Sequence, residues 1–284
     1  MLWRTLRDDF HRALCRDVLR WHADGSPNNA DKSNRLSRAL ARGLWQAVQQ
    51  RVACPFRTEV LPPQRVGKHF EQVVHDYLSR AFDALEHLRP GPWRFYLNHR
   101  IEEFVQYRHL ADLTRALKTH PALRAALGDY IIAPDILVAR EPWPDAAINR
   151  QARPPLVAGR EIAGLTPLRR VNNTTPILHA SISCKWTIRS DRSQNVRTEG
   201  LNLIRNRKGH TPHIVVITAE PAPSRLASLA MGTGDLDAVY HIALPELRAA
   251  AQRLGDETAQ ELLTTMVEGQ RLRDISDLPF DLAV

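Results

Sequence analysis

The sequence predicts a single α/β domain over residues 1–284, with a central mixed β-sheet flanked by helices and an N-terminal helical portion packed against it. Two observations support this fold class. Apolar residues recur at helical spacing over much of residues 2–89, whereas strand-like and helix-like stretches alternate after residue 176. No stretch between these regions has the composition of a flexible linker, and no internal repeat is present, so we expect one domain.

The N-terminal part of the chain is expected to be mainly helical. Leu6, Phe10 and Leu14 follow one another at four-residue steps, which places them on one face of a helix. Pro62-Pro63 separates two later helical patterns, because proline cannot continue a helix. The elements expected here are a helix over 2–22, a turn-rich loop over 24–29, helices over 34–52 and 66–89, a strand over 93–97, and helical residues 107–128 interrupted at Pro121.

The rest of the chain is expected to supply most of the sheet. Residues 130–138 contain two β-rich pieces around Pro134, which predicts a strand pair or a bent strand. The segment 141–176 is rich in Pro, Asn and Arg and predicts an excursion from the core. The elements expected after it are a strand over 178–188, a helix over 196–206, a strand over 213–218, a helix over 221–231, a strand over 238–242 and helical residues 245–268.

The composition favours a globular protein with a polyanionic partner. Hydrophobic residues make up 43% of the chain and charged residues 25%, a balance that permits a sizeable core. The net charge of +8 favours a nucleic acid, because Lys and Arg side chains that neutralise phosphates release counterions. No apolar run is long enough to span a bilayer, and the N-terminus begins an amphipathic helix and not a signal peptide.

The cysteines bear on the cellular compartment. The chain has three of them, Cys15, Cys54 and Cys184, and they lack the spacing of zinc ligands. An odd number argues against a disulfide scaffold and fits a reducing environment. We therefore expect a cytoplasmic protein without a disulfide framework.

Two short segments contain residues suited to phosphodiester hydrolysis. Pro134-Asp135 precedes three apolar residues, and an alternating strand over 181–186 contains Lys185. An aspartate can bind the divalent cation that activates water, and a lysine can stabilise the developing negative charge. An acid on one strand and a lysine on the next are typical of PD-(D/E)XK nucleases, although Ser183 stands where the general motif has an acid.

Each of these residues also has a purely structural interpretation. Asp135 could be a turn residue after proline, Cys184 a small core residue, and Ser183 a residue that only packs. A Pro-Asp pair and a strand lysine also occur together by chance in many proteins. Lys185 is the hardest to explain in structural terms, because the strand that contains it is otherwise apolar.

The segment that follows carries a specific resemblance. Residues 185–192 read Lys-Trp-Thr-Ile-Arg-Ser-Asp-Arg, which resembles the K-x-x-x-R-S-D-R block of the NgoMIV-type, CCGG-recognising restriction endonucleases. In that family the missing acid is moved to the following helix, where this sequence has Glu199. The resemblance covers most of the chain, and the other matching segments are Asp31-Lys32-Ser33, Gln64, Gly67-Lys68-His69-Phe70-Glu71 and Glu220-Pro221-Ala222-Pro223-Ser224-Arg225.

The resemblance implies a PD-(D/E)XK restriction endonuclease-like core with a Mg²⁺ site. Asp135 is implied as the central metal ligand, and Glu199 as a ligand that reaches the same metal directly or through water. The backbone carbonyl of Cys184 is implied to face the metal, so that its thiol need not react.

The same resemblance implies roles for the residues around the metal. Lys185 would orient or polarise the attacking water, and Ser183 would occupy the vacated acid position. Glu71 would support the site from its helix. The alternative for Glu71 and Glu199 is a solvated helix face, which is the usual place of a helical glutamate.

Base recognition is expected from Arg189, Asp191 and Arg192. An arginine can bind guanine O6 and N7 bidentately, and an aspartate can accept a hydrogen bond from cytosine N4 in the major groove. Two arginines and one acid in each subunit can therefore read one half of CCGG, and a twofold dimer can read the palindrome. The alternative is an exposed charged loop held by internal salt bridges.

The resemblance also implies contacts outside the CCGG core. Residues that match Arg225, Asp31 and Ser33 contact the outer G·C pair in that family, and the one that matches Gln64 reaches the minor groove. Their presence favours GCCGGC as the full site. Arg225 could instead contact a phosphate from a helix N-terminus, and Asp31 or Ser33 could be helix caps before 34–52.

The function implied is that of a type II restriction endonuclease of a restriction-modification system, which hydrolyses double-stranded DNA by metal-activated water. The resemblance further implies cleavage after the first G, four-base 5′-CCGG overhangs, and a homotetramer made of two dimers, with a dimer as the minimum. Two alternatives remain open. One is a DNA-binding protein without catalysis, and the other is a PD-(D/E)XK nuclease without sequence specificity.

Overall fold

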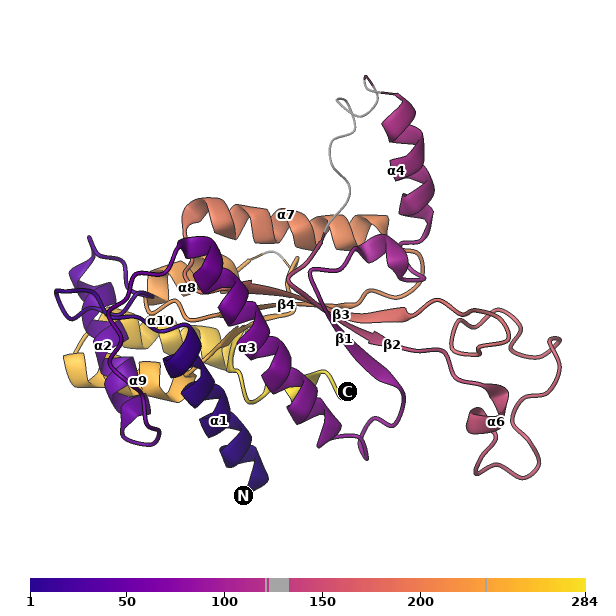
Figure 1. The fold of residues 1–284 in the computed structure, drawn as a ribbon, viewed down its shortest axis with the longest axis horizontal. Helices are drawn as coiled ribbons and strands as arrows, with labels where there is room; N and C mark the ends of the chain where they lie inside the picture. Colours follow the sequence, from indigo (N-terminus) through magenta and orange to yellow (C-terminus); the bar gives the residue numbers. More distant parts are fainter. Residues whose placement is uncertain (121, 123–132, 233) are drawn as a thin grey trace.

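The computed structural model describes residues 1–120, 122, 133–232 and 234–284, and for residues 190–192 it describes the backbone alone. In this part of the chain the centre is a mixed six-stranded sheet whose strands lie in sequence order (Figure 1). The second strand pairs antiparallel with both the first and the third, and each later strand pairs parallel with the strand before it. The strands are β1 Trp93–Leu97, β2 Ile136–Arg140, β3 Ile177–Lys185, β4 His213–Thr218, β5 Ala238–His241 and β6 Leu272–Asp274.

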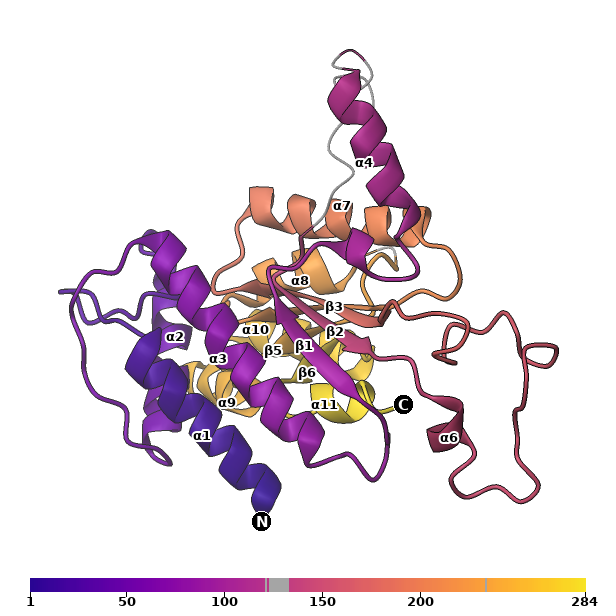
Figure 2. The same ribbon diagram turned by 45° about the vertical axis from the view of Figure 1, so that its right-hand side comes forward.

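Helices of both halves of the chain cover the sheet. In the N-terminal half, α1 packs against α3, and α3 packs across β1 and β3 through buried residues such as Phe70 and Val74 (Figures 1 and 2). From the other half, α9 packs against α2, and α7 packs beside α8. The α-helices are α1 Leu2–Asp17, α2 Arg35–Gln49, α3 Pro63–Asp83, α4 His109–Thr119, α6 Asp145–Ile148, α7 Ser190–Asn206, α8 Pro223–Ala230, α9 Leu244–Leu254, α10 Glu257–Glu268 and α11 Leu278–Asp281.

The predicted α/β architecture, with a central mixed sheet, flanking helices and an N-terminal helical portion, is confirmed. A 3-10 helix over Ile101–Glu103 precedes α4, and no helix in the described ranges is both long and apolar enough to cross a membrane. The predicted residues 130–132 and 123–128 lie outside the described part of the chain.

Several element boundaries, and one strand, differ from the sequence prediction. The helix α1 ends at Asp17 and not at residue 22, and α3 ends at Asp83 and not at residue 89. The strand β3 ends at Lys185 and not at residue 188, and α7 begins at Ser190 and not at residue 196. The first turn of α7 contains only polar residues, so it carries no apolar periodicity that would predict a helix. The strand β6 was not predicted, because three residues are too few for a recognisable alternation.

The segment 141–176 forms the predicted excursion, an arm that projects from the sheet and contains the short helix α6 (Figures 1 and 2). Its centre is Arg169, whose side chain is 1% exposed. The guanidinium donates to both carboxylate oxygens of Asp145, at 2.9 and 2.6 Å, and to the carbonyl of Gly159 at 2.7 Å. A buried, fully paired arginine therefore holds the arm together in place of a hydrophobic core.

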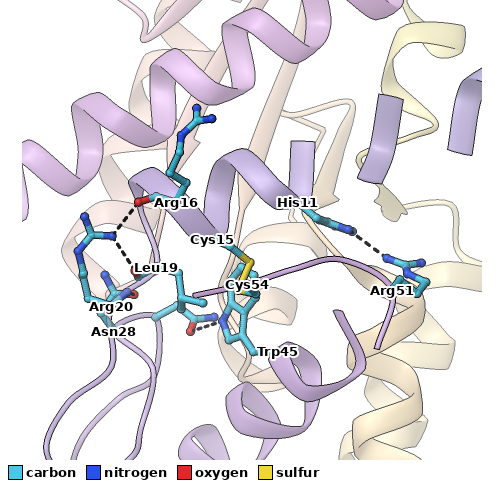
Figure 3. The surroundings of a disulfide bond; sticks show 10 residues. His11, Cys15, Arg16, Leu19, Arg20, Asn28, Trp45, Arg51 and Cys54 are labelled. Atoms are coloured by element: carbon cyan, nitrogen blue, oxygen red, sulfur yellow. Dashed lines mark hydrogen bonds between the residues drawn. A yellow bond between two sulfur atoms is a disulfide. The ribbon is translucent and has the colours of Figure 1, made fainter. Parts of the chain in front are cut away.

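The expectation that the chain has no disulfide was wrong. Cys15 of α1 and Cys54 form a disulfide (Figure 3) with a Cα–Cα distance of 5.0 Å. Cys184 remains as a free, buried cysteine. The bond ties the segment before α3 to α1, where Trp21 and Phe56 also stack. The pairing could not be predicted, because 39 positions separate the two cysteines and only the packing of α1 brings them together.

We expect Cys54→Ser to lower the free energy of unfolding by about 2–4 kcal/mol, because the cross-link restricts the unfolded chain between residues 15 and 54. Denaturant titration without reductant measures the effect. Reduced wild type should match the variant, and reductant should leave the variant unchanged. A wild-type midpoint that is insensitive to reductant would contradict this prediction.

Candidate active site and DNA-binding cleft

The structure brings Asp135 and Lys185 into direct contact. Asp135 immediately precedes β2, and Lys185 is the last residue of the neighbouring strand β3. Because β2 and β3 are antiparallel, with Ile136 opposite Ile182, these ends of the two strands lie side by side. The Oδ2 of Asp135 accepts hydrogen bonds from Lys185 Nζ at 2.9 Å and from the backbone N–H of Cys184 at 2.6 Å.

This contact keeps the lysine charged. The side chain of Lys185 is 21% exposed, and burial by itself would lower its pKa. The ion pair and hydrogen bond with Asp135 outweigh burial, so that the pKa of Lys185 is raised. The site therefore holds a positive ammonium group next to a carboxylate at neutral pH.

Glu199 of α7 lies close to β3, the strand that contains Lys185. Its Oε2 accepts a hydrogen bond from the Oγ of Ser183 at 3.2 Å. Burial raises the pKa of Glu199, while the nearby charge of Lys185 opposes the shift. The carboxylate of the helix thus lies at the strand position where the general nuclease motif has an acid, and the solvated-face alternative for Glu199 is wrong.

Glu71 joins the cluster through a residue that the sequence analysis missed. Asn98 follows β1 and donates its side-chain N–H to Glu71 Oε2 at 3.1 Å and its backbone N–H to the carbonyl of Asp135 at 3.0 Å. Its φ of 49° lies in the left-handed region, which asparagine tolerates better than most residues. Burial raises the pKa of Glu71, so this side chain is not on a fully solvated helix face either. The sequence signal that could have identified Asn98 is an asparagine directly after a predicted strand.

The donor set fits a hard divalent cation such as Mg²⁺. Asp135 and Glu199 offer carboxylate oxygens, which such cations prefer, and their charges interact across the site. Burial raises the pKa of the Cys184 thiol well above its usual value, so the sulfur stays protonated and is no thiolate ligand. In the described residues no group of three or more His, Cys, Asp or Glu is already arranged around a metal position, and Asp135 pairs with Lys185.

A cavity of about 1090 Å³ connects these residues with the predicted DNA contacts. Lys185 and Glu199 line the cavity together with residues from four segments of the chain, within 20–33, 58–67, 184–199 and 224–228. Gln64 lies exposed at the start of α3, where its neighbour Pro63 lines the cavity. The predicted DNA contacts that do line the cavity are Asp31, Ser33, Arg189 and Arg225.

Asp31, Ser33 and Arg225 form one network in this cavity. Asp31 forms an ion pair with Arg225, and its other oxygen accepts from the backbone N–H of Ser33 at 3.0 Å and from Ser33 Oγ at 2.7 Å. The hydrogen bond from the Ser33 hydroxyl is the main cause that lowers the pKa of Asp31. The helix-cap alternative is wrong, because Asn34 caps α2 by accepting from Ser37 N–H at 3.0 Å.

The three predicted readers of the CCGG core lie where β3 passes into α7. Arg189 is the exposed residue that precedes the helix and lines the cavity. Asp191 and Arg192 belong to the first turn of α7, and their side chains lie outside the described part of the structure. The backbone therefore places all three residues just after β3, the strand that ends at Lys185.

Comparison with known proteins assigns the family. A family model described as NgoMIV restriction enzyme matches residues 10–284. The chain is 48% identical over 290 residues to the type II restriction enzyme NgoMIV of Neisseria gonorrhoeae, which covers 100% of this chain and 99% of that protein. The type IIF restriction endonuclease Bse634I, solved with cognate DNA, is similar with a TM-score of 0.39 and 13% identity over 70% of this chain and 78% of its own. The chain therefore belongs to the NgoMIV restriction enzyme family and is a type II restriction endonuclease.

Proposed function

We propose that residues 1–284 form a single-domain, Mg²⁺-dependent endonuclease that cuts double-stranded DNA at GCCGGC, after the first G, and leaves 5′-CCGG overhangs. The observation that supports this most is the shared cavity. It is lined by Lys185 and Glu199 and also by Arg189 and Arg225, so the residues proposed for hydrolysis and those proposed for base reading border the same space. A bound duplex would meet both sets at once.

Hydrolysis requires a nucleophile in line with the scissile phosphorus. Mg²⁺, held by Asp135, Glu199 and the carbonyl of Cys184, would supply positive charge to the phosphate and make the attacking water more acidic. Lys185 would orient that water and stabilise the developing charge, since its ammonium group already sits 2.9 Å from Asp135. Ser183 would hold Glu199 in place, and Glu71 would act on the site through Asn98, which bonds to Asp135.

Recognition of the six base pairs would be divided between two parts of the cavity. Arg189, Asp191 and Arg192 would read the CCGG core, because the guanidinium and carboxylate groups match guanine and cytosine edges in the major groove. Arg225 and Asp31 would read the outer G·C pair with help from Ser33, and Gln64 would contact the minor groove. Without DNA, Arg225 and Asp31 satisfy each other as an ion pair, so each must exchange its partner for a base on binding.

Plasmid digestion distinguishes this function from its rivals. The protein is incubated with plasmid DNA and Mg²⁺, and a parallel sample contains EDTA. Discrete fragments whose ends map to GCCGGC support the proposal, whereas a smear indicates a nuclease without sequence specificity. A gel shift of the DNA without cutting would indicate a DNA-binding protein that lacks catalysis.

A palindromic site requires a twofold dimer, and we propose that two such dimers form a homotetramer that works in the cytoplasm, where the DNA is. The arm over residues 141–176 supports a second interface. It projects from the sheet yet exposes large apolar side chains, with Leu156 66%, Ile162 67% and Leu165 99% exposed. Apolar groups on a well-organised arm are typical of a protein–protein contact, here with a second copy of the chain.

We expect Leu165→Glu to convert the tetramer into dimers, because a buried, unpaired carboxylate would destabilise the contact between arms. Light scattering coupled to size-exclusion chromatography measures the mass. Thermal stability of the dimer should be unchanged, since Leu165 makes no part of the core. A tetramer that survives the substitution would show that the arm is not the second interface.

A further inference from the structure

The most deeply buried acid next to the cleft is one to which the proposed function gives no role. Glu220 follows β4, precedes α8 and is 0% exposed. Its Oε2 accepts from the backbone N–H of Ile188 at 2.9 Å, and its Oε1 accepts from the backbone N–H of Ala222 at 3.0 Å. One side chain thus connects the segment that leads into α7 with the corner that leads into α8.

Glu220 also faces the predicted reader of the outer base pair. Its Oε2 lies 3.7 Å from Nη1 of Arg225, and the other end of that guanidinium pairs with Asp31. Arg225 therefore lies between two carboxylates. Asp31 lines the cavity and is partly exposed, whereas Glu220 is fully buried.

A second buried contact fixes the loop that contains Asp31 to the same corner. The side-chain N–H of Asn29 donates to the carbonyl of Ala219 at 2.7 Å, and Asn29 Oδ1 accepts from Trp45 Nε1 at 3.0 Å. Asn29 is 0% exposed, like Glu220. The three segments that contain predicted base readers thus meet at residues 219 and 220. They are the loop before α2, the connection between β3 and α7, and the start of α8.

The chemistry of a carboxylate matters at this position. Glu220 accepts two backbone N–H donors and faces a guanidinium, so an ionised acid satisfies every partner. A glutamine has a single acceptor oxygen, and its NH₂ group would meet one of the N–H donors. Burial raises the pKa of Glu220, while the two N–H groups and Arg225 oppose that shift.

We propose that Glu220 is a positioning residue for sequence recognition, which holds Arg225 in its reading geometry when Asp31 turns from it to the DNA. Glu220 also accepts a hydrogen bond from Ile188, the residue before Arg189 in the sequence. It thereby sets the distance between Arg225 and Arg189. The two parts of the recognition surface are then placed by one buried acid. This inference rests on the proposed function.

The test measures cleavage of short duplexes that share the CCGG core and carry each of the four symmetric outer base pairs. For Glu220→Gln we expect the preference for the outer G·C pair to fall by about 5- to 150-fold, the loss of a bidentate base contact. Glu246→Gln is the matched control, because Glu246 is a buried acid that is paired with Arg7 and does not line the cavity. The control should be less stable than wild type but keep the wild-type preference.

A double-mutant cycle separates positioning from general damage. If Glu220 acts through Arg225, then Glu220→Gln should cause no further loss of outer-pair preference in an Arg225→Ala background. Glu220→Asp, which keeps the charge but is one methylene shorter, should show a smaller loss of the same kind and serves if the glutamine variant does not fold. A folded Glu220→Asp or Glu220→Gln protein with full wild-type preference would overturn the inference.

The wild-type measurements distinguish this failure from failure of the proposed function. If wild type prefers the outer G·C pair and the Glu220 variants do so equally, only the positioning role is wrong. If wild type cuts all four duplexes equally or cuts none, the proposed GCCGGC site is wrong, and the role of Glu220 is overturned with it.

Discussion

Lys185→Ala is expected to lower the rate of DNA cleavage by at least about 10²–10³-fold, the usual effect of removing a group that stabilises transition-state charge. The ammonium group of Lys185 is 21% exposed and lies 2.9 Å from the carboxylate of Asp135, which places its positive charge in the proposed site. Binding to a GCCGGC duplex without Mg²⁺ should be retained, because Lys185 is not one of the predicted base-reading residues. Single-turnover cleavage and fluorescence anisotropy measure the two quantities.

The matched control for this experiment is Lys118→Ala. Lys118 is exposed on α4, outside the cavity that contains Lys185. Its removal changes the net charge of the protein by the same amount and should leave cleavage unchanged. If Lys185→Ala cuts at the wild-type rate, this lysine has no part in the mechanism.

Asp135→Asn is expected to remove both metal binding and cleavage. The substitution takes away the carboxylate proposed as the central ligand, and even residues that only support metal ligands alter affinity by about 10–100-fold. It also removes the ion pair of Asp135 with Lys185, which is expected to lower the pKa of the lysine relative to wild type. Calorimetric titration with Mg²⁺ measures the loss of metal binding, and single-turnover cleavage measures the loss of activity.

Asp281→Asn is the corresponding control, because Asp281 pairs with Arg273 at 2.6 Å on α11 and does not line the cavity. This variant should bind Mg²⁺ and cut DNA as wild type does. An Asp135→Asn protein that still binds the cation with wild-type affinity would refute the assignment of Asp135 as ligand.

The contact between Asp135 and Lys185 could be predicted because it joins the ends of two adjacent strands. Asp135 and Lys185 stand at the ends of apolar segments, and such segments become neighbouring strands in a central sheet. Glu199 could be found only through the family resemblance. In the sequence it is one glutamate among the polar residues of α7, and periodicity does not show which of them faces Ser183.

Other features depend on contacts between segments that are distant in the sequence. The Cys15–Cys54 bond, the link from Asn98 to Glu71 and the burial of Glu220 all arise where separate elements meet. Composition misled in the first case, because an odd number of cysteines still allows one pair. The other two residues are polar side chains next to strands, which the sequence alone would assign to turns.

The sequence by itself determined the order of helices and strands up to β5, the acid and lysine at the ends of two apolar segments, and the block that begins at Lys185 and marks the family. These properties follow from hydrophobic periodicity and from short motifs, which act over a few residues. Only the tertiary structure decided that the loop with Asp31, the end of β3 and the corner with Arg225 form one cavity. That arrangement depends on long-range packing and on buried polar contacts such as those of Asn29 and Glu220, whose partners no local pattern specifies.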